Sequence, residues 1–439
     1  MIAQHNQQTR PYIYELDPLR AITAVAVVLV HVLSGTMFLN HTAAGLLAQN
    51  GIFTSIHFTR EIFMFVTALA LTYVYYGKPF SMKRFWAKRS IGVLLPYCIW
   101  SIAYTWVNTS QHSPGAFAKL ALFNILTGNA SYQLYYILLA IEFYLVLPLF
   151  LLLLKHIHKH PWRALLISFA LQVLLMSLDY RYIQQGSLAS SGVWQMVAAV
   201  QNSFLLTYQF YFILGGLAAL YLKQARAFVL SHGKWIVGCF VLALAAVWVH
   251  FLLQVDVFHE SFGYATSVLQ PMMTFYSPTV IVLLGFLACR WAMQTNQQGH
   301  PKGYRFWHTL SDASFGIYLV HVFILTALLQ RIVPLMPAAW PVALRVFLTW
   351  FLTAGGAAGI SILLMKTPVL SHLVGRTAHW RSSWDANALH EWLSKTFLAA
   401  CLSAARTQFI SLLGRLQKTM TFRHPRKVEQ KGSGDARHV

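Results

Sequence analysis

The stretch that decides the fold is residues 17–39, which read DPLRAITAVAVVLVHVLSGTMFL. Its ionisable residues are Asp17, Arg20 and His31, and most of the others are apolar. Coiled as an α-helix, the stretch extends about 35 Å, which is enough to cross the roughly 30 Å hydrocarbon core of a bilayer. The sequence therefore predicts a transmembrane helix here.

Further apolar stretches of similar length follow along the chain. Together with the first they predict ten spans, at about 17–39, 54–77, 90–109, 133–155, 163–179, 204–223, 235–255, 268–291, 309–332 and 342–365. We therefore expect an all-α, polytopic membrane protein with about ten transmembrane helices.

Composition supports a membrane protein over a soluble one. Hydrophobic residues make up 57% of the chain and charged residues only 10%, whereas a soluble domain carries about 25% charged residues. In a soluble protein the formal net charge of +21 would suggest nucleic-acid binding. Here the basic residues lie between apolar stretches, where they set topology, so we expect a lipid bilayer as partner and no nucleic acid.

The loops between the predicted spans alternate in charge. The loops after spans three, five and seven carry little positive charge, with Lys119 and Arg181 as their basic residues. The positive-inside rule therefore predicts that both termini are cytoplasmic. We expect the protein to be a multi-pass protein of the plasma (inner) membrane. The loops after spans two, four, six and eight hold the other basic residues: Lys78, Lys83, Arg84, Lys88, Arg89, Lys155, Lys159, Arg163, Lys223, Arg226, Lys234, Arg290, Lys302 and Arg305.

The chain divides into three predicted parts: a cytoplasmic N-terminal segment (1–16), a transmembrane domain (17–366) and a basic cytoplasmic tail (367–439). Apolar residues recur in the tail at helical spacing among basic ones, which predicts an amphipathic helix on the inner leaflet. These apolar residues are Leu389, Trp392, Leu393, Phe397, Phe409, Leu412, Leu413 and Leu416.

Ionisable residues inside the predicted spans are candidates for function, because they are costly at membrane depth. Arg20 and His31 are eleven residues apart and share one helix face, about 16 Å apart along the axis. Ser314, Tyr318 and His321 share another face. Glu142 lies at a depth similar to that of the two histidines, which indicates an internal polar cavity. The alternatives are a snorkelling arginine and polar contacts that only hold helices together.

The motif Asp17-x-Leu19-Arg20, followed by ten residues and His31, resembles the opening signature of acyltransferase family 3. Other segments resemble later motifs of the family: residues 83–89 (KRFWAKR) before 95–97 (LPY), residues 143–148 (FYLVLP) and residues 314–321 (SFGIYLVH). The resemblance covers roughly Glu15 to Met365. The chain departs from the family at Thr67-Ala68, where many members have Ser-Gly, and has one glutamate, Glu142, where many have a pair.

Members of this family are ten-helix, mostly bacterial enzymes that acylate sugars of the cell envelope. The resemblance therefore implies an O-acyltransferase that transfers groups other than amino-acyl groups. The expected donor is acyl-CoA, carrying an acetyl or succinyl group, and the expected acceptor is a hydroxyl of an envelope sugar or polysaccharide, as in O-acetylation.

The resemblance also suggests roles for the polar residues of the spans. At the inner face, Arg20, Lys88 and Arg89 would hold the CoA phosphates, although loop residues of this kind also serve topology alone. His31 would be the general base. Tyr318 or Ser314 would stabilise the oxyanion, with His321 orienting one of them, and Glu142 completes the candidate catalytic group.

We expect no metal, because the alternating His156, His158 and His160 on a helix end point apart. The main alternative function is an exporter or carrier of a polysaccharide or glycolipid. Broken helices in matched halves would favour it, but the glycine pairs at 215–216 and 355–356 do not form such halves. A non-catalytic scaffold would leave the ionisable residues of the spans unexplained.

Overall fold

The computed structural model describes residues 10–110, 113–184, 192–295 and 299–376, all within one compact unit. Most of these residues are helical, and no β-strand occurs among them; Thr295 and Pro301 form an isolated bridge. The predicted all-α fold class is therefore confirmed. The amphipathic helix expected in the tail lies outside the described residues, and the cytoplasmic placement of the termini stays a prediction.

Within the described residues, nine helical stretches are long and apolar enough to cross a membrane. A further pair, Leu205–Leu220 and Leu222–Ser231, is bent by 98°, and its first helix coincides with the predicted sixth span. The prediction of about ten transmembrane helices is confirmed. The nine stretches are Leu16–Gly35, Ala43–Tyr75, Met82–Asn108, Tyr135–Ile157, Pro161–Gln184, Gly233–Val257, Pro271–Ala292, Tyr304–Leu335 and Val342–Lys366.

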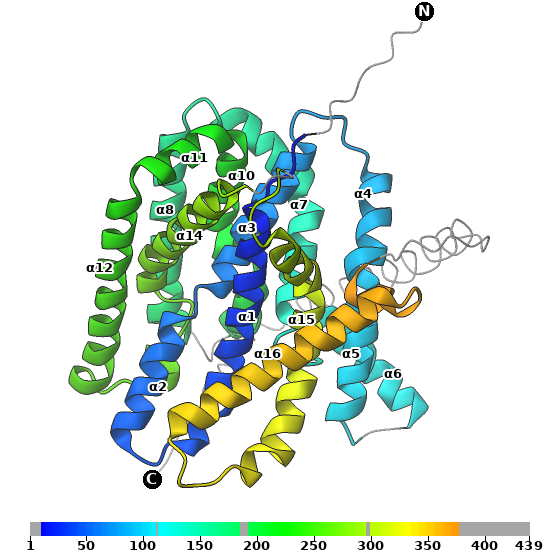
Figure 1. Ribbon diagram of the computed structural model, residues 1–439, viewed down its shortest axis with the longest axis vertical. Coiled ribbons are helices and arrows are strands. Elements are labelled where there is room, and N and C mark those ends of the chain that lie inside the picture. Colours follow the sequence, from blue (N-terminus) through cyan, green and yellow to red (C-terminus); the bar gives the residue numbers. More distant parts are fainter. Residues whose placement is uncertain (1–9, 111–112, 185–191, 296–298, 377–439) are drawn as a thin grey trace, which may run out of the picture. The chain divides into compact units, whose positions relative to one another are not determined.

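Figure 1 labels the helices used below. They are α1 (Leu16–Gly35), α2 (Ala43–Ser55), α3 (Thr59–Tyr75), α4 (Met82–Arg89), α5 (Leu95–Asn108), α6 (Pro114–Thr127), α7 (Tyr135–Ile157), α8 (Pro161–Leu178), α10 (Gln209–Leu220), α11 (Leu222–Ser231), α12 (Gly233–Leu252), α14 (Pro271–Ala292), α15 (Tyr304–Arg331) and α16 (Val342–Lys366).

Two spans are interrupted in ways that hydropathy alone did not indicate. The second begins at α2 and breaks at residues 56–58 before α3, which places His57 inside the break. The third begins earlier than predicted, at α4, and widens into a π-helical segment, Ser90–Leu94, before α5. Pro96 follows this segment; it has no amide hydrogen and its ring crowds the preceding turn, which favours such a widening.

Helices α1 and α15 pack side by side and run in the same direction. Near their starts Asp17 contacts His308, and further along His31 contacts His321. Helix α16 packs against both, and in Figure 1 it crosses in front of them. The shared direction matters because it brings the two histidines predicted from the sequence to the same level.

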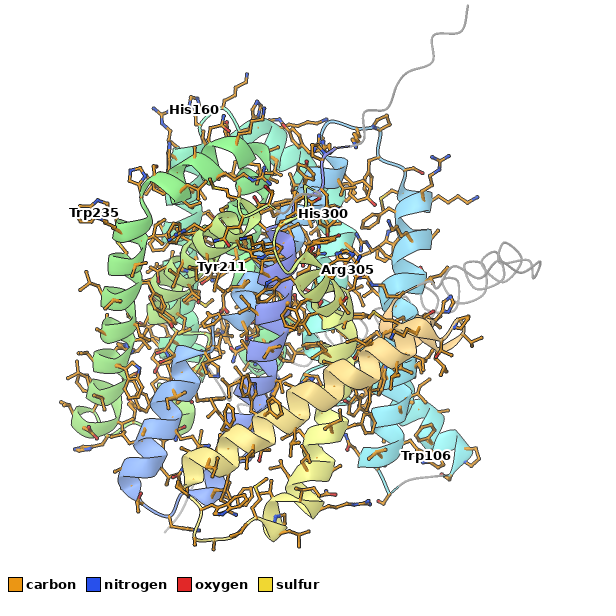
Figure 2. All side chains as sticks on the ribbon, in the orientation of Figure 1. Trp106, His160, Tyr211, Trp235, His300 and Arg305 are labelled. Atoms are coloured by element: carbon orange, nitrogen blue, oxygen red, sulfur yellow. The ribbon has the colours of Figure 1, made fainter. Side chains whose placement is uncertain are left out.

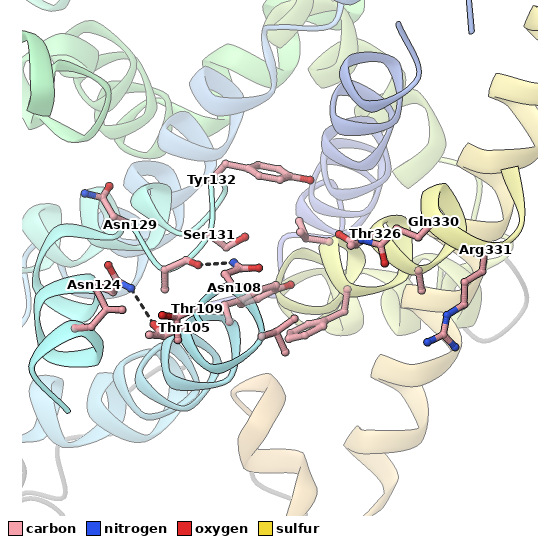
Figure 3. Close-up of a pocket in the computed structure, with 17 residues that line it drawn as sticks. Thr105, Asn108, Thr109, Asn124, Asn129, Ser131, Tyr132, Thr326, Gln330 and Arg331 are labelled. Atoms are coloured by element: carbon pink, nitrogen blue, oxygen red, sulfur yellow. Dashed lines mark hydrogen bonds between the residues drawn. The ribbon is translucent and has the colours of Figure 1, made fainter. Parts of the chain in front are cut away.

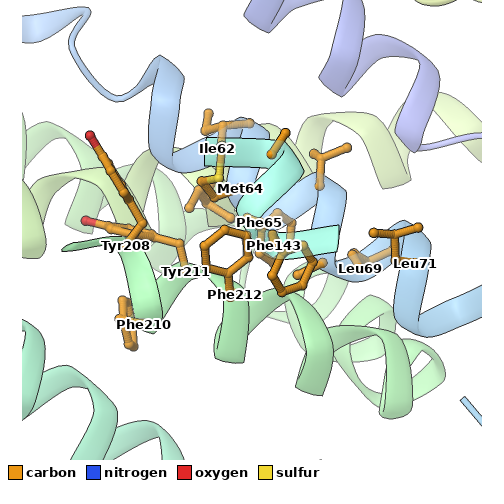
Figure 4. Packing of buried hydrophobic residues seen from close by; sticks show 14 of the residues in the cluster. Ile62, Met64, Phe65, Leu69, Leu71, Phe143, Tyr208, Phe210, Tyr211 and Phe212 are labelled. Atoms are coloured by element: carbon orange, nitrogen blue, oxygen red, sulfur yellow. The ribbon is translucent and has the colours of Figure 1, made fainter. Parts of the chain in front are cut away.

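A second group of helices packs around α3 and α10. Gly215 of α10 lies so close to α3 that a Cβ atom there would clash with the carbonyl oxygen of Phe65, so only glycine permits this approach. The Phe143 and Phe212 rings stack with their centroids 4.1 Å apart in the middle of this cluster (Figure 4). Close packing of this kind replaces the hydrophobic effect as the cohesive force between helices in lipid.

Large apolar side chains cover the outward faces of α8 and α12. Trp162, Ile167 and Leu242 are about 70% exposed or more, and Trp235 projects away from α12 at the edge of Figure 2. A soluble protein rarely exposes so much contiguous apolar surface, whereas lipid chains would cover it. These faces identify the protein as an integral membrane protein.

Candidate active site

The centre of the candidate site is a stacked pair of histidines, His31 from α1 and His321 from α15. Their ring centroids are 5.2 Å apart and their planes are inclined by 25°. We call them the histidine pair. In this arrangement each ring presents its nitrogen atoms at its own edge, so the two side chains do not use each other as hydrogen-bond partners.

His321 is fully buried, and its hydrogen bonds define where its proton lies. Its Nδ1 atom lies 3.1 Å from the carbonyl oxygen of Ile317 and 2.9 Å from that of Tyr318. Because carbonyl oxygens only accept, Nδ1 carries the proton of the neutral ring and Nε2 holds the lone pair. Nε2 is buried and has no hydrogen-bond partner in the described part of the chain. A buried acceptor left unpaired is costly, and such atoms are typical of functional sites.

The loop before α7 closes one side of the histidine pair. The Tyr132 ring lies 4.8 Å from the His31 ring. The buried Tyr318 hydroxyl donates to the backbone carbonyl oxygen of Gln133, and the Ser131 hydroxyl donates to the Gln133 side chain over 2.6 Å. These bonds fix the loop against α15 and hold Tyr132 beside His31.

Arg60, at the start of α3, supplies a positive charge near the histidine pair. Its guanidinium lies over the rings of Tyr135 and Tyr208, 5.6 and 6.0 Å from their centroids, and donates to the Asn202 side chain over 3.2 Å. Arg60 is close enough to His31 to interact with it electrostatically. The site therefore combines two imidazoles with a fixed cation, an arrangement that can move a proton and stabilise an anion.

Three arginines converge at the other end of α1. Arg20 interacts electrostatically with Arg89, at the end of α4, and with Arg376, which follows α16. We call these three residues the basic rim. Buried atoms of this region, Arg89 Nε and Ser90 Oγ, have no hydrogen-bond partner among the described residues. Converging positive charges with free donors fit a polyanion such as a phosphate group.

Of the basic residues proposed for CoA phosphates, Arg20 and Arg89 therefore lie together, whereas the Lys88 side chain is exposed. Arg376 lies with them as well, although the sequence did not predict it. Nothing in its sequence context links Arg376 to Arg20, some 350 positions earlier. Its guanidinium also forms an ion pair with Asp312 of α15.

Two predicted catalytic residues lie apart from the histidine pair. The Glu142 carboxylate accepts a hydrogen bond from the backbone N–H of Leu205 over 3.2 Å, which is a local role at the break before α10. The Ser314 hydroxyl donates to the carbonyl oxygen of Ser311 in its own helix over 2.6 Å. Neither side chain contacts His31 or His321, so the structure gives no support to a direct catalytic role for either one.

Tyr132, His57 and Arg60 are neighbours of the histidine pair that were not among the predicted site residues. His57 lies in the break between α2 and α3, is buried, and interacts electrostatically with His31. Tyr132 belongs to a short polar loop without periodicity. Neither Tyr132 nor His57 had a selective signal in the sequence, because the helix break at His57 is visible only in the structure.

Among the described residues there is no cluster of histidine, cysteine and acidic side chains that could hold a metal ion. At the end of α7, His156 and His158 place their Nδ1 atoms 2.8 Å from backbone carbonyl oxygens of their own helix.

Comparison with known proteins gives one match. No curated protein and no solved structure matches the chain. A family model described as an acyltransferase domain matches residues 13–366, which extend from just before α1 to the end of α16 and include the histidine pair, Arg20, Arg89 and Arg60. This chain belongs to acyltransferase family 3.

Proposed function

We propose that the protein transfers an acyl group, acetyl or succinyl, from acyl-CoA to a hydroxyl of a cell-envelope sugar or polysaccharide. The observation that carries the proposal is that α1 joins the two parts of the site: it carries His31, which stacks on His321 with its unpaired Nε2 atom, and Arg20 of the basic rim. Arg20 and His31 are separated by eleven residues, or about 16 Å along α1. A donor with its phosphates at the rim could extend its thioester along α1 toward the histidines.

In the proposed reaction, an imidazole of the histidine pair accepts the proton of the acceptor hydroxyl. The hydroxyl oxygen attacks the thioester carbonyl carbon, a C–O bond forms, and the C–S bond then breaks. The departing CoA sulfur takes the proton back from the imidazolium, which restores the neutral ring. His31 is the proposed base because it contacts the Tyr132 loop and Arg60 acts on it electrostatically.

We assign the stabilisation of the oxyanion to Arg60. Of the hydroxyls considered for this role, that of Tyr318 donates to the Gln133 carbonyl oxygen and that of Ser314 donates to the Ser311 carbonyl oxygen. A hydroxyl has a single proton to donate, so each is already engaged. A guanidinium keeps several donors and its charge, and it favours negative charge that develops nearby.

The test is acyl transfer by the purified full chain in lipid nanodiscs, with isotope-labelled acetyl-CoA and succinyl-CoA and a mixture of envelope glycans. The substitution His31→Ala should reduce transfer by about 10²–10⁴-fold while the protein remains inserted and folded. His250→Ala is the matched control, since His250 lies in α12, outside the site. Transfer by His31→Ala within a few-fold of wild type would refute the assignment of the base.

The bend between α10 and α11 is the observation that favours the exporter alternative, because transporters use broken helices. The same nanodisc protein in sealed vesicles separates the two functions. Release of CoA thiol that depends on a glycan acceptor supports the enzyme, whereas glycan movement across the vesicle membrane without acyl-CoA supports the carrier.

A further inference from the structure

A polar cavity lies at the ends of α5 and α15 that are remote from the basic rim. It has a volume of about 710 Å³ and is bounded by α5, α6, α15 and the loop that carries Tyr132 (Figure 3). Arg89 precedes α5 and Asn108 ends it, while Arg331 ends α15. The cavity is therefore at the opposite end of these helices from the residues proposed to hold CoA.

The cavity is lined by neutral amides that are held in place yet retain free atoms. Asn108 donates to the Ala130 carbonyl oxygen over 3.0 Å, and Asn124 donates to the Thr105 hydroxyl over 3.0 Å, as the dashed lines in Figure 3 show. The side chains of Asn129 and Gln330 have no hydrogen-bond partner in the described part of the chain. Each amide offers both a donor and an acceptor, which is what sugar hydroxyls require.

An aromatic ring and a cation complete the lining. Tyr132 is 55% exposed, and its ring offers an apolar face of the kind on which a sugar ring can pack. Arg331 is the only charged residue that lines the cavity, and no acidic side chain pairs with it within the described ranges. An unpaired arginine facing a polar cavity fits a ligand that carries a carboxylate or a phosphate.

Tyr132 links this cavity to the chemistry. Its ring lines the cavity and also lies 4.8 Å from His31, and in Figure 3 it points from its loop toward α1. Val322, the residue after His321, lines the same cavity. A sugar in the cavity would thus have one edge beside the histidine pair.

We propose that the cavity is the acceptor site and that it selects an anionic sugar. The amides would bind ring hydroxyls, Tyr132 would pack on one sugar face, and Arg331 would hold a carboxylate or phosphate substituent. The role as acceptor site rests on the proposed acyl transfer, but binding of the sugar itself does not.

The test is direct binding, measured by saturation-transfer NMR on the full chain in nanodiscs without acyl-CoA. The probes are glucose, glucuronate and glucose 6-phosphate, which share a ring and differ at carbon six. We expect both anionic sugars to bind wild-type protein about tenfold or more tightly than glucose, as charge-assisted hydrogen bonds are the stronger ones. Glucuronate and glucose 6-phosphate then show whether carboxylate or phosphate is preferred.

Two variants with matched controls test the lining. Gln330→Leu should weaken the binding of all three sugars by about tenfold, which corresponds to the loss of one or two hydrogen bonds. Gln224 is an exposed glutamine of α11, so Gln224→Leu should leave sugar binding unchanged. Arg331→Gln should remove the preference for the anionic sugars and leave glucose binding unchanged, whereas Arg181→Gln should keep that preference.

The proposal is overturned if wild-type protein binds none of these sugars, if Gln330→Leu and Gln224→Leu bind them alike, or if Arg331→Gln keeps the anion preference. Acyl-transfer assays on the same samples separate this result from the proposed function. Sugar binding that responds to Gln330 in a protein that never uses acyl-CoA would refute the acyl transfer alone. Normal transfer by both cavity variants would refute the acceptor site alone.

Discussion

The two halves of α15 differ in whether their polar side chains have partners. In the half that begins at Tyr304, His308 and Asp312 are paired with residues from distant parts of the chain, and the buried Ser311 hydroxyl is the exception. In the half that ends at Arg331, several polar atoms have no partner among the described residues. Both halves belong to one continuous helix, and the difference follows the residues that pack against each half.

The paired half is organised around Asp17, which is 1% exposed. Its carboxylate accepts from the Tyr12 hydroxyl over 2.9 and 3.0 Å, and lies 3.3 Å from Nδ1 of His308. Burial, this hydrogen bond and the negative charge of Asp17 raise the pKa of Tyr12, whose hydroxyl therefore remains a donor. The opposite edge of His308 faces Asp312, which Arg376 also contacts.

The unpaired half contains the buried Nε2 atom of His321, followed by the Gln330 and Arg331 side chains at the cavity. Pairing of a buried polar group recovers most of the free energy lost by removing it from water, whereas an unpaired one lowers stability. The comparison therefore predicts that changes in the paired half lower stability, and that changes in the unpaired half lower activity without lowering stability.

The largest effect is expected for His321→Phe, which keeps a flat ring but removes both ring nitrogens, Nε2 among them. If the unpaired atom serves the reaction, acyl transfer should fall by about 10²–10⁴-fold. The melting temperature should change little, because Nε2 has no partner to lose and the carbonyl oxygens that Nδ1 contacts keep their hydrogen bonds within α15. Acyl transfer and thermal unfolding in nanodiscs measure the two quantities. His250→Phe in α12 is the control, and a marked loss of stability in His321→Phe would break the comparison.

The opposite behaviour is expected for Asp17→Asn in the paired half. The amide loses one acceptor oxygen and places a donor among the Tyr12 and His308 groups, which should destabilise the fold by about 1–3 kcal/mol. Thermal unfolding measures this change. Tyr12→Phe, which removes the donor alone, should cost less. An Asp17→Asn protein as stable as wild type would show that the pairing does not contribute to stability.

Tyr318 lies at the boundary between the two halves of α15. Tyr318→Phe should lower stability less than Asp17→Asn and should also loosen the loop that carries Tyr132. The variant leaves the Gln133 carbonyl oxygen without its donor, at a cost of about 1 kcal/mol. The loop should loosen beside Tyr132, so hydrogen exchange should become faster at residues 129–134. Unchanged exchange there would mean that other contacts position Tyr132.

The smallest effect is expected for Arg376→Gln, which removes the ion pair with Asp312. Both side chains are more than 30% exposed, and exposed ion pairs contribute about 0–1 kcal/mol. The melting temperature should therefore change little, while the half-saturating acyl-CoA concentration should rise if the basic rim binds its phosphates. A large loss of stability would instead assign Arg376 to the structural network.

The sequence predicted many of the site residues and their depth in the membrane, but not which of them contact one another. The spacing of Arg20 and His31 placed them on one face of α1, and the similar depth of His31 and His321 was predicted before their contact was seen. Glu142 had the same predicted depth, yet its side chain turns to the Leu205 backbone. Depth follows from counting residues along a helix, whereas the direction of a side chain depends on how that helix is rotated.

The sequence by itself determined that the chain crosses a membrane about ten times and where most of the spans lie, although not where the second and third begin. In lipid every backbone group must be paired within its own helix, so an apolar stretch of sufficient length specifies a span without reference to the rest of the chain. Only the tertiary structure decided that His31 meets His321 and Tyr132, that Arg376 joins Arg20 and Arg89, and that a polar cavity opens beside them. Those contacts join residues far apart in sequence, and they depend on helix order, rotation and loop conformation, which packing between helices settles.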